Sequence, residues 1–310
     1  MKLTKPKFWK TKKSVIPFLL LPLTFLILII IWFKKKLTKI NIFKTKVICI
    51  GNIFMGGTGK TPLSIFIANE LLKSGKRPSI IRKFYKNHED EYHLIKKNYP
   101  NLIVGKNRIV AIHEAIEKNF DTVVLDDGFQ DYKIKKDFNI LCFNDRQLIG
   151  NGFVMPSGPL RESFSSIKNA DMVVINGNKN EKFENKVKKF NEKVSFYYSY
   201  YKLMNTEKFK DKNIMAVAGI GNPENFFTLL KENDLNVKEE IIYPDHHQFK
   251  KSELDILIKR AKNKNYQIVM TEKDYLRTKK FNYKSIDYSK IELVIDNKKN
   301  LMNSINKIYD

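Results

Sequence analysis

The stretch that decides the fold is Lys46-Val-Ile-Cys-Ile-Gly-Asn-Ile-Phe-Met-Gly-Gly-Thr-Gly-Lys-Thr-Pro62, in which an apolar run leads into glycines, a lysine and a threonine. A strand followed by such a loop and a helix is typical of a phosphate-binding loop, because glycines allow successive backbone N–H groups to turn toward an anion. Lys60 would place a positive charge at the β- and γ-phosphates, and the hydroxyl of Thr61 would bind Mg²⁺. The strict pattern has glycine where this chain has Phe54. A glycine-rich turn without a ligand is the alternative.

The helix expected over residues 61–74 begins beside this loop. Proline suits the first turn of a helix, as at Pro62, and the positive end of the helix dipole would face a bound anion. Gly56 and Gly57 would give the backbone the conformational freedom that the pattern's glycine, absent at position 54, would otherwise supply. We therefore predict nucleotide binding by the whole loop, which comprises Met55, Gly56, Gly57, Thr58, Gly59, Lys60, Thr61 and Pro62.

Length and composition favour two domains. The chain has 310 residues and ample apolar content for a core. Its formal net charge of +24 fits an anionic partner such as nucleic acid, a membrane surface or an anionic substrate. Because lysine is spread through the whole chain, this charge is a weak indication, and no nucleic-acid partner is expected. Cys49 and Cys142 lie in apolar runs without metal-binding spacing, which fits a reducing compartment.

An uncharged run over residues 15–33 is long enough to cross a hydrocarbon core of roughly 30 Å, and a transmembrane helix is expected there. Lysines flank the run on both sides, so the positive-inside rule does not decide its orientation. Because ATP is cytoplasmic, we expect the body that follows to lie in the cytoplasm, where its lysines face anionic lipids. Pro17 and Pro22 leave open a kinked or interfacial segment.

Short apolar runs alternate with helical patterns, which is typical of βαβ units and a parallel sheet. In the first half, strands are expected at 46–51, 79–82, 102–104, 122–126, 139–143 and 172–176, and helices at 61–74, 90–97 and 107–119. In the second half, strands are expected at 213–218, 238–242, 266–271 and 292–296, and helices at 222–232 and 251–263. The predicted fold is α/β, a P-loop NTPase-like parallel sheet with helices on both faces and a second, smaller α/β domain. The expected divisions are a membrane segment with basic flanks (1–36), a P-loop core (37–178), a β linker (179–208) and a C-terminal domain (209–310).

Two adjacent carboxylates end a predicted strand in Thr122-Val-Val-Leu-Asp-Asp-Gly-Phe-Gln130. In an open parallel sheet, ligands bind outside the carboxyl ends of the strands. If this strand neighbours the strand before the phosphate loop, Asp126 or Asp127 would hold Mg²⁺ directly or through water. An Asp-Asp-Gly turn that only ends a strand is the alternative, and the phosphate loop upstream favours the metal site.

A long loop rich in glycine and proline is expected over residues 144–171, and such loops are usually functional. Its end reads Gly158-Pro-Leu-Arg-Glu162. The guanidinium of Arg161 suits bidentate contact with a phosphate, and an ion pair with Glu162 is the alternative.

Two further polar clusters are candidates for chemistry. Asp245-His246-His247 follows a predicted strand, and an imidazole there suits acid–base chemistry better than a zinc site. A surface histidine pair without a role is the alternative. Asp90-Glu91 begins a short helix, where acids are also favoured by the helix dipole alone.

Taken together, these motifs resemble the tetraacyldisaccharide 4′-kinase family, the lipid A 4′-kinases. Several ordered motifs at compatible spacing are more specific than any one of them. The resemblance implies ATP- and Mg²⁺-dependent transfer of the γ-phosphoryl group to the 4′-hydroxyl of a tetraacyl glucosamine disaccharide 1-phosphate, which gives lipid IVA, at the cytoplasmic face of the bacterial inner membrane. The matching segments are Gly51-Asn-Ile53, Gly56-Gly-Thr-Gly-Lys-Thr-Pro62, Asp126-Asp-Gly-Phe-Gln130, Gly158-Pro-Leu-Arg-Glu162, Ala218-Gly-Ile-Gly-Asn-Pro223, Asp245-His-His247 and Thr271-Glu-Lys-Asp274.

The resemblance also implies roles for single residues. Asp90 lies where the family has the base for the attacking hydroxyl, and His246 matches its partner histidine. The expected catalytic residues are Asp90, His246, Lys60 and Asp127; the expected metal-side residues are Thr61, Asp126 and Asp127; and the expected substrate contacts are Asp90, Arg161, Glu162 and His247.

A membrane-anchored switch ATPase without a lipid substrate is the alternative function, since that class shares the Gly-Gly-x-Gly-Lys-Thr core. It usually carries a further lysine just before the glycines, where this chain has Met55. The kinase is therefore favoured. The expected partners are the lipid substrate and the anionic lipids of the inner membrane, and a monomer is expected.

Overall fold

The computed structural model describes residues 6–9, 11, 13–86 and 88–310, and these fall into two compact units. Unit 1 contains the described residues of Tyr85–Asn98 and Tyr201–Val294, and unit 2 contains the other described residues. Unit 1 thus takes a segment of the first half of the chain, residues 85–98, because the helix in this segment packs on a helix of the second half. The chain passes from unit 2 into unit 1 within β7, and it returns to unit 2 at the end of β12.

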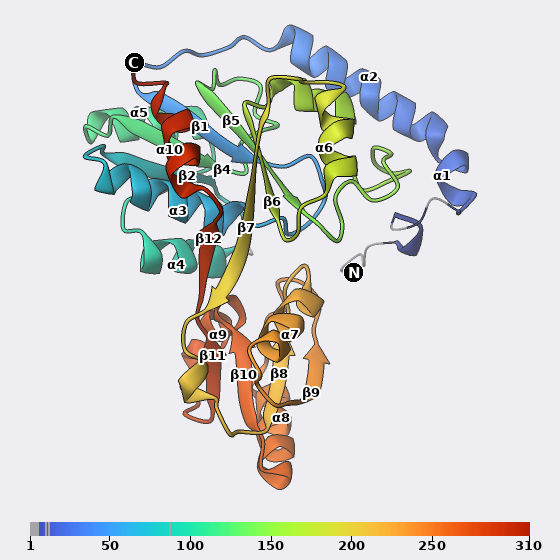
Figure 1. Cartoon of the computed structure of the whole chain (residues 1–310), viewed down its shortest axis with the longest axis vertical. Coiled ribbons are helices and arrows are strands. Elements are labelled where there is room, and N and C mark those ends of the chain that lie inside the picture. The colour runs from blue at the N-terminus through green and yellow to red at the C-terminus, as the bar shows by residue number, and fades with distance from the viewer. Residues whose placement is uncertain (1–5, 10, 12, 87) are drawn as a thin grey trace. The chain divides into compact units, whose positions relative to one another are not determined.

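An eight-stranded sheet forms the centre of unit 2 (Figure 1). Its strand order is β12-β7-β6-β5-β1-β4-β2-β3, and β1 pairs in parallel with β4 on one side and β5 on the other. The core strands β1, β4 and β6 are buried almost throughout, as expected for a parallel sheet covered on both faces. The strands are β1 (Lys46–Gly51), β2 (Pro78–Lys83), β3 (Leu102–Gly105), β4 (Thr122–Asp126), β5 (Phe138–Asn144), β6 (Met172–Asn176), β7 (Ser195–Leu203) and β12 (Ile291–Ile295).

Helices of unit 2 pack on this sheet through regularly spaced apolar residues. Helix α3 (Lys60–Lys73) contacts β1, β2 and β4, and α5 (Arg108–Glu117) contacts β2 and β3. Helix α6 (Glu181–Lys188) buries Phe183 and Val187, one turn apart, against the apolar cluster around β5 and β6. The remaining helical segments are α10 (Lys298–Asn306), η1 (Lys7–Trp9) and η2 (Phe164–Asn169).

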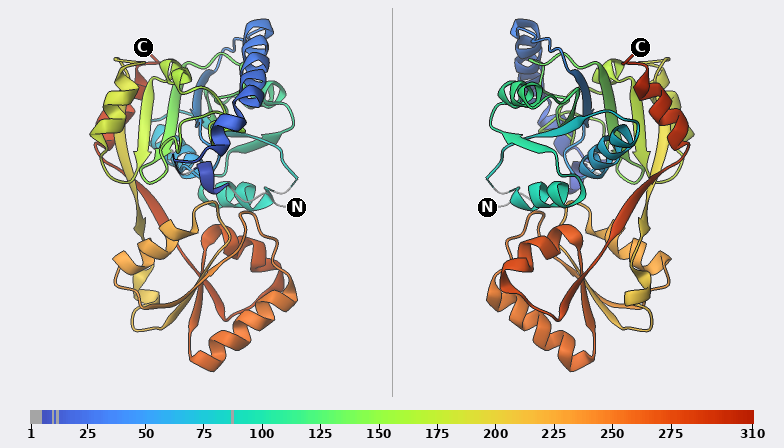
Figure 2. Two further views of the ribbon diagram at one scale, coloured as in Figure 1. Left: turned by 90° about the vertical axis from the view of Figure 1, so that its right-hand side faces the viewer. Right: turned by 90° about the vertical axis from the view of Figure 1, so that its left-hand side faces the viewer.

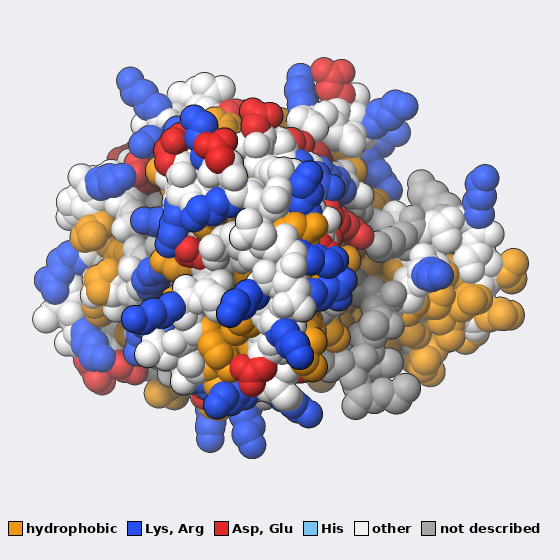
Figure 3. All heavy atoms as spheres, turned by 90° about the horizontal axis from the view of Figure 1, so that it is seen from below, with side chains coloured by type: hydrophobic (Ala, Val, Ile, Leu, Met, Phe, Trp, Pro, Cys, Tyr) orange, Lys and Arg blue, Asp and Glu red, His pale blue; other side chains and the backbone are white. Residues whose placement is uncertain are grey.

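The N-terminal apolar run forms two helices, α1 (Ile16–Leu19) and α2 (Leu21–Leu37), with a proline at the start of each. The α2 residue Thr24 is buried, and its hydroxyl contacts the hydroxyl of Ser157 at 2.7 Å. Much of the remaining apolar surface is exposed, including Phe18, Leu19 and Phe25, and Figure 3 shows a patch of hydrophobic side chains on the right of its view, where α1 lies.

The structure does not support the transmembrane helix that we predicted. Among the described residues, none of the helices combines the length and the apolar character that crossing a bilayer requires. The run over residues 15–33 is divided between α1 and α2, and the 17 residues of α2 end in three lysines and a leucine. Part of the predicted basic flank, at positions 2, 5, 10 and 12, lies outside the described residues.

Unit 1 is built on a four-stranded parallel sheet with the order β11-β10-β8-β9 (Figure 2). Alternate residues of β8 point to opposite faces: Ile214 and Ala216 pack with α7, while Met215 and Val217 pack with α8. The elements are β8 (Ile214–Ala218), β9 (Val237–Ile242), β10 (Gln267–Thr271), β11 (Ile286–Ser289), α4 (Glu89–Asn98), α7 (Pro223–Glu232), α8 (Lys251–Lys264), α9 (Glu272–Thr278), η3 (Thr206–Lys208) and η4 (Lys279–Phe281).

The predicted α/β fold is confirmed, and the predicted strands and helices lie within a few residues of the observed ones. The segment 179–208, expected to be a β linker, contains β7 but also α6. The side chain of Asn180 caps this helix by accepting a hydrogen bond from the Phe183 N–H at 3.0 Å. Because the segment is rich in lysine, the two apolar residues of α6 that lie one turn apart, Phe183 and Val187, did not indicate a helix in the sequence.

Candidate functional site

The phosphate loop of unit 2 is held in a defined shape. Gly59, at the N-cap of α3, has a φ of 88°, a left-handed conformation that glycine adopts without strain. The Asn52 amide nitrogen donates to the Thr58 hydroxyl at 2.9 Å and to the Gly56 carbonyl at 3.3 Å. The loop therefore leads directly into the first turn of α3, where Lys60 and Thr61 lie.

Phe54, which replaces a glycine of the usual pattern, has a structural role. Its side chain is buried in the apolar cluster of unit 2. Its backbone forms a bridge to Leu160, and the next residue, Met55, donates its N–H to the Pro159 carbonyl at 2.8 Å. The phosphate loop is thus anchored to the segment that carries Arg161.

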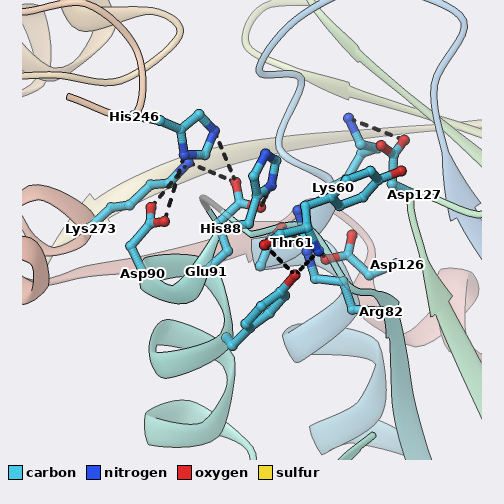
Figure 4. Close-up of polar contacts among 12 residues, drawn as sticks. Lys60, Thr61, Arg82, His88, Asp90, Glu91, Asp126, Asp127, His246 and Lys273 are labelled. Atoms are coloured by element: carbon cyan, nitrogen blue, oxygen red, sulfur yellow. Dashed lines mark hydrogen bonds and ion pairs between the residues drawn. The ribbon is translucent and has the colours of Figure 1, made fainter. Parts of the chain in front are cut away.

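The carboxyl end of β4 lies beside the phosphate loop, because β4 pairs in parallel with β1 and Asp126 is in register with Ile50. Asp126 is fully buried and accepts a hydrogen bond from the Thr61 hydroxyl at 3.0 Å. Arg82, at the end of β2, donates to both Asp126 and Thr61 (Figure 4). The other carboxylate oxygen of Asp126, Oδ1, accepts no hydrogen bond from any residue that the structure describes.

This donor set fits a magnesium ion. Mg²⁺ prefers oxygen ligands and is usually held by one or two carboxylates together with phosphate oxygens and water. A hydroxyl and a carboxylate lie 3.0 Å apart at the start of α3, and the buried Oδ1 atom of Asp126 has free acceptor capacity. The residues that would hold the ion are therefore Thr61 and Asp126.

Asp127 lies between two cations. Its φ is 59°, and its carboxylate is 3.6 Å from Lys60 Nζ and accepts hydrogen bonds of 2.9 and 3.1 Å from Arg161. Burial raises the pKa of this carboxyl, but the charges of Lys60 and Arg161 outweigh burial and lower the pKa to about 2. Burial lowers the pKa of the Lys60 ammonium, and the Asp127 charge offsets part of this effect. Asp127 is thus ionised at neutral pH.

Asp127→Asn should make unit 2 less stable in a pH-dependent way. The folded-state pKa lies below the value of about 3.9 for an unfolded aspartate, so the carboxylate contributes stability above pH 4 that is lost as the pH falls through 2. We expect a loss of about 1–2 kcal/mol at pH 7 that shrinks toward pH 2, measured as the urea midpoint across pH.

Asp211→Asn is the matched control for this variant. Asp211 is an exposed aspartate with a φ of 60°, and asparagine also tolerates this conformation. The urea midpoint of Asp211→Asn should equal that of the wild type at every pH. A loss in Asp127→Asn that is as large at pH 2 as at pH 7 would show that packing, and not charge, stabilises this position.

Arg161 and Glu162, which were predicted to contact substrate, are in different environments. Arg161 faces the phosphate loop through Asp127 and is also 3.3 Å from Gln130. Glu162 is buried, with 1% of its surface exposed, and pairs at 2.5 Å with Lys35 of α2. Glu162 therefore attaches α2 to this unit, and its contact with substrate stays a prediction.

In unit 1, Asp90 is buried in the first turn of α4, beside Lys273 and Arg277 of α9 and His246 of the turn after β9 (Figure 4). Its Oδ2 atom lies 2.7 Å from Arg277 and 3.6 Å from Lys273, and its Oδ1 atom lies 3.6 Å from His246 Nδ1. Burial raises the pKa of the Asp90 carboxyl, but His246, Lys273 and Arg277 together hold it well below its ordinary value. Asp90 is therefore ionised at neutral pH.

Arg277 connects Asp90 to the rest of unit 1. Its buried guanidinium also donates to the Gly219 carbonyl at 2.9 Å and to Asp274 Oδ1 at 2.6 Å. The other oxygen of Asp274 accepts from Thr271 at 2.6 Å and from the Gly219 N–H at 2.9 Å. The motif Thr271-Glu-Lys-Asp274 therefore caps α9 and orients Arg277 toward Asp90.

The adjacent histidines are separated by the backbone. His246 has a φ of 58°, and its side chain lies beside Asp90 and stacks on His88 with ring centroids 4.3 Å apart. His247 instead contacts Glu253 at 3.1 Å and stacks on Tyr243. The structure thus brings His246, and not His247, to Asp90, while the predicted substrate contact of His247 stays a prediction.

Sequence reasoning missed three cations of these clusters: Arg82, Lys273 and Arg277. Arg82 carried a signal, since it is the last residue of the predicted strand 79–82, and the carboxyl ends of parallel strands lie at the same sheet edge. Lys273 lies inside a motif that was considered, but nothing in its spacing indicated Asp90. Arg277 comes three residues after Asp274, so both side chains lie on the same side of α9. This spacing from an acidic residue was the feature of the sequence that could have indicated Arg277.

Comparisons with known proteins agree with one another. A sequence model of the family described as tetraacyldisaccharide-1-P 4′-kinase matches residues 16–310. The tetraacyldisaccharide 4′-kinase of Pelagibacter ubique (strain HTCC1062) is 42% identical over 314 residues, covering 100% of this chain and 99% of the relative. The enzyme of the same name from Rickettsia felis is 30% identical over 313 residues, covering 96% and 95%. The apo form of LpxK from Aquifex aeolicus, crystallised in complex with ATP, superposes with a TM-score of 0.73 at 26% identity, covering 95% of this chain and 99% of that one.

Proposed function

The chain belongs to the tetraacyldisaccharide-1-P 4′-kinase family, and from this premise we propose how its residues carry out the reaction. The enzyme transfers the γ-phosphoryl group of ATP to the 4′-hydroxyl of a tetraacyl glucosamine disaccharide 1-phosphate. The bond between the γ-phosphorus and its bridging oxygen breaks, ADP leaves, and a new bond forms between that phosphorus and the 4′-oxygen. The hydroxyl proton must pass to a base.

The donor half of the reaction belongs to the phosphate loop. The observation that carries this assignment is that Thr61, at the start of α3, contacts the buried carboxylate of Asp126. Backbone N–H groups of residues 56–61 bind the phosphates of ATP, aided by the N-terminus of α3. Lys60 and Arg161 stabilise the negative charge of the transferring group, and both are already oriented by Asp127.

Thr61 and Asp126 would hold Mg²⁺, with Asp127 close by. The ion would supply positive charge that offsets the negative charge of the phosphates. Arg82 fixes the position of both ligands by donating to each of them.

The acceptor half belongs to Asp90 and His246. Asp90 is ionised at neutral pH and can accept the proton of the 4′-hydroxyl. His246 Nδ1, 3.6 Å from Asp90, stabilises the orientation of this carboxylate and can share the proton. Arg277 is a positioning residue, since its guanidinium contacts Asp90 Oδ2 at 2.7 Å and His246 Nδ1 at 3.5 Å and acts through these two side chains. Arg161, Glu162 and His247 are further candidates for contact with the disaccharide.

We also propose that the protein works as a monomer at the cytoplasmic face of the bacterial inner membrane. The exposed apolar residues of α1 and α2, followed by lysines, support contact with a lipid surface rich in anionic headgroups. The acylated acceptor would be presented at such a surface.

A test of the function is the acceptor dependence of ATP use. With Mg²⁺ present, the tetraacyl disaccharide 1-phosphate should raise ADP formation by at least about tenfold over the rate with ATP alone, because the hydroxyl is the nucleophile that the site orients. An otherwise identical acceptor without the 4′-hydroxyl is the control and should give no increase. ATP hydrolysis that is independent of the acceptor would instead indicate a switch ATPase.

A further inference from the structure

Three metal-ligating side chains meet in unit 1 beside Asp90. His88 precedes α4, Glu91 lies in its first turn, and His246 comes from the turn after β9 (Figure 4). His88 Nδ1 is 3.0 Å from Glu91 Oε2, and His246 Nε2 is 3.9 Å from Glu91 Oε1. One ligand atom from each residue lies within 4.8 Å of the other two.

The types of ligand indicate the class of ion. Two imidazole nitrogens and a carboxylate oxygen suit Zn²⁺ and the neighbouring late first-row transition metals, while Mg²⁺ and Ca²⁺ prefer sets made only of oxygen. Ligand atoms on one tetrahedral zinc ion lie about 3.3 Å apart, given bonds of about 2.0–2.1 Å. The three ligand atoms, which lie within 4.8 Å of one another, would have to approach by up to about 1.5 Å to reach this spacing.

The surroundings of His246 match those of a metal-bound histidine. Such a histidine usually directs its second ring nitrogen to a carboxylate, which fixes the tautomer that leaves the first nitrogen available to the ion. His246 has part of this arrangement: Nδ1 lies 3.6 Å from Asp90 and 3.5 Å from the Arg277 guanidinium, while Nε2 lies 3.9 Å from Glu91 and 3.8 Å from Asp245. The side chains of His88, Glu91 and His246 are 30%, 13% and 19% exposed, so an ion from solvent can reach them.

We propose that His88, Glu91 and His246 form a binding site for a divalent transition-metal ion of the zinc class, with a fourth position open to water. The site is distinct from the magnesium ligands, which lie in unit 2. The Lys273 ammonium is 2.7 Å from Glu91 Oε1 and would repel a cation bound to that oxygen. Glu91 Oε2, the oxygen that faces His88, is therefore the one that binds.

Binding has a consequence for catalysis that rests on the proposed function. A metal on Nε2 holds His246 in one tautomer and prevents it from sharing the proton that Asp90 accepts. Occupancy should therefore inhibit phosphoryl transfer. A zinc-class ion would act as an inhibitor, while Mg²⁺ would leave the site empty.

The test uses Co²⁺ as a coloured substitute for Zn²⁺ and the full chain without nucleotide. Titration should produce a visible absorption that saturates at one ion per chain. His88→Ala should weaken binding by at least about tenfold, since even loss of a partner outside the ligand set usually costs that much. His93→Ala is the matched control, because His93 is an exposed histidine on the same helix, and its affinity should equal that of the wild type.

No saturable absorption, or equal affinities for His88→Ala and His93→Ala, would overturn the site. Kinase assays at fixed Mg²⁺ and rising Zn²⁺ then test the consequence: inhibition should occur at lower Zn²⁺ in the wild type and His93→Ala than in His88→Ala. Because the absorption is read without ATP or acceptor, it stands whether or not the chain phosphorylates the disaccharide. Binding of Co²⁺ without any inhibition by Zn²⁺ would support the site and contradict the role of His246 in proton transfer.

Discussion

Asp90→Asn is expected to lower kcat by about 10²–10⁴-fold, the usual contribution of a general base. Asparagine keeps the shape of the side chain but cannot accept the proton of the 4′-hydroxyl. Since Asp90 belongs to unit 1 and the residues proposed to bind ATP belong to unit 2, the KM for ATP should change little. The measurement is steady-state kinetics with both substrates varied.

The control for Asp90→Asn addresses folding, because the variant removes the charge of one of the two carboxylates that pair with the buried Arg277. The urea midpoint and the KM for ATP show whether the protein is still assembled. Glu89→Gln, an exposed change at the neighbouring position of α4, should keep kcat within about twofold, as surface changes usually do. A folded Asp90→Asn enzyme with kcat near that of the wild type would contradict the assignment of the base.

Lys60→Ala is expected to lower kcat/KM for ATP by about 10²–10³-fold, the usual cost of removing one group that stabilises transition-state charge. The ammonium lies at the first residue of α3 and is held by Asp127 at 3.6 Å. Both KM for ATP and kcat should suffer, because a lysine in this position contacts phosphates in the ground state and in the transition state.

Lys73→Ala tests whether the loss is specific, since Lys73 lies at the other end of the same helix and is largely exposed. Its kinetics should match those of the wild type. Full activity of Lys60→Ala, or an equal loss in the two variants, would show that the phosphate loop is not the donor site.

Much of the fold followed from the sequence because apolar periodicity is local. The alternation of strand and helix patterns predicted the parallel sheets. That β1 and β4 are neighbours, on which the predicted metal site depended, came from the structure. The packing of α4 was not predictable in this way. Its partner, α9, lies more than 170 residues away in the chain, so no local pattern could indicate that residues 85–98 belong to unit 1.

The membrane prediction failed for a physical reason that was visible in the sequence. A count of uncharged residues measures length, but Pro17 and Pro22 limit how much of that length forms one helix. The single buried polar side chain of α2, Thr24, also binds Ser157 of unit 2, so one face of this helix packs on protein.

The candidate site was predictable where chemistry is tied to a motif, and not where it depends on backbone conformation. Lys60, Thr61 and Asp126 follow from spacing. The choice between His246 and His247 depends on the left-handed φ of His246, which directs the two rings apart. The resemblance favoured His246, and in the structure the His246 ring lies beside Asp90, while its catalytic role stays a prediction.

The most direct test of the central claim follows the γ-phosphoryl group itself. Wild-type protein is incubated with Mg²⁺, ATP labelled at the γ-phosphate and the tetraacyl disaccharide 1-phosphate, and the labelled products are separated and mapped. We predict that the label is recovered as a monoester on the 4′-oxygen of the disaccharide, in an amount equal to the ADP formed. Label found only in inorganic phosphate, or attached to the existing 1-phosphate, would contradict this mechanism.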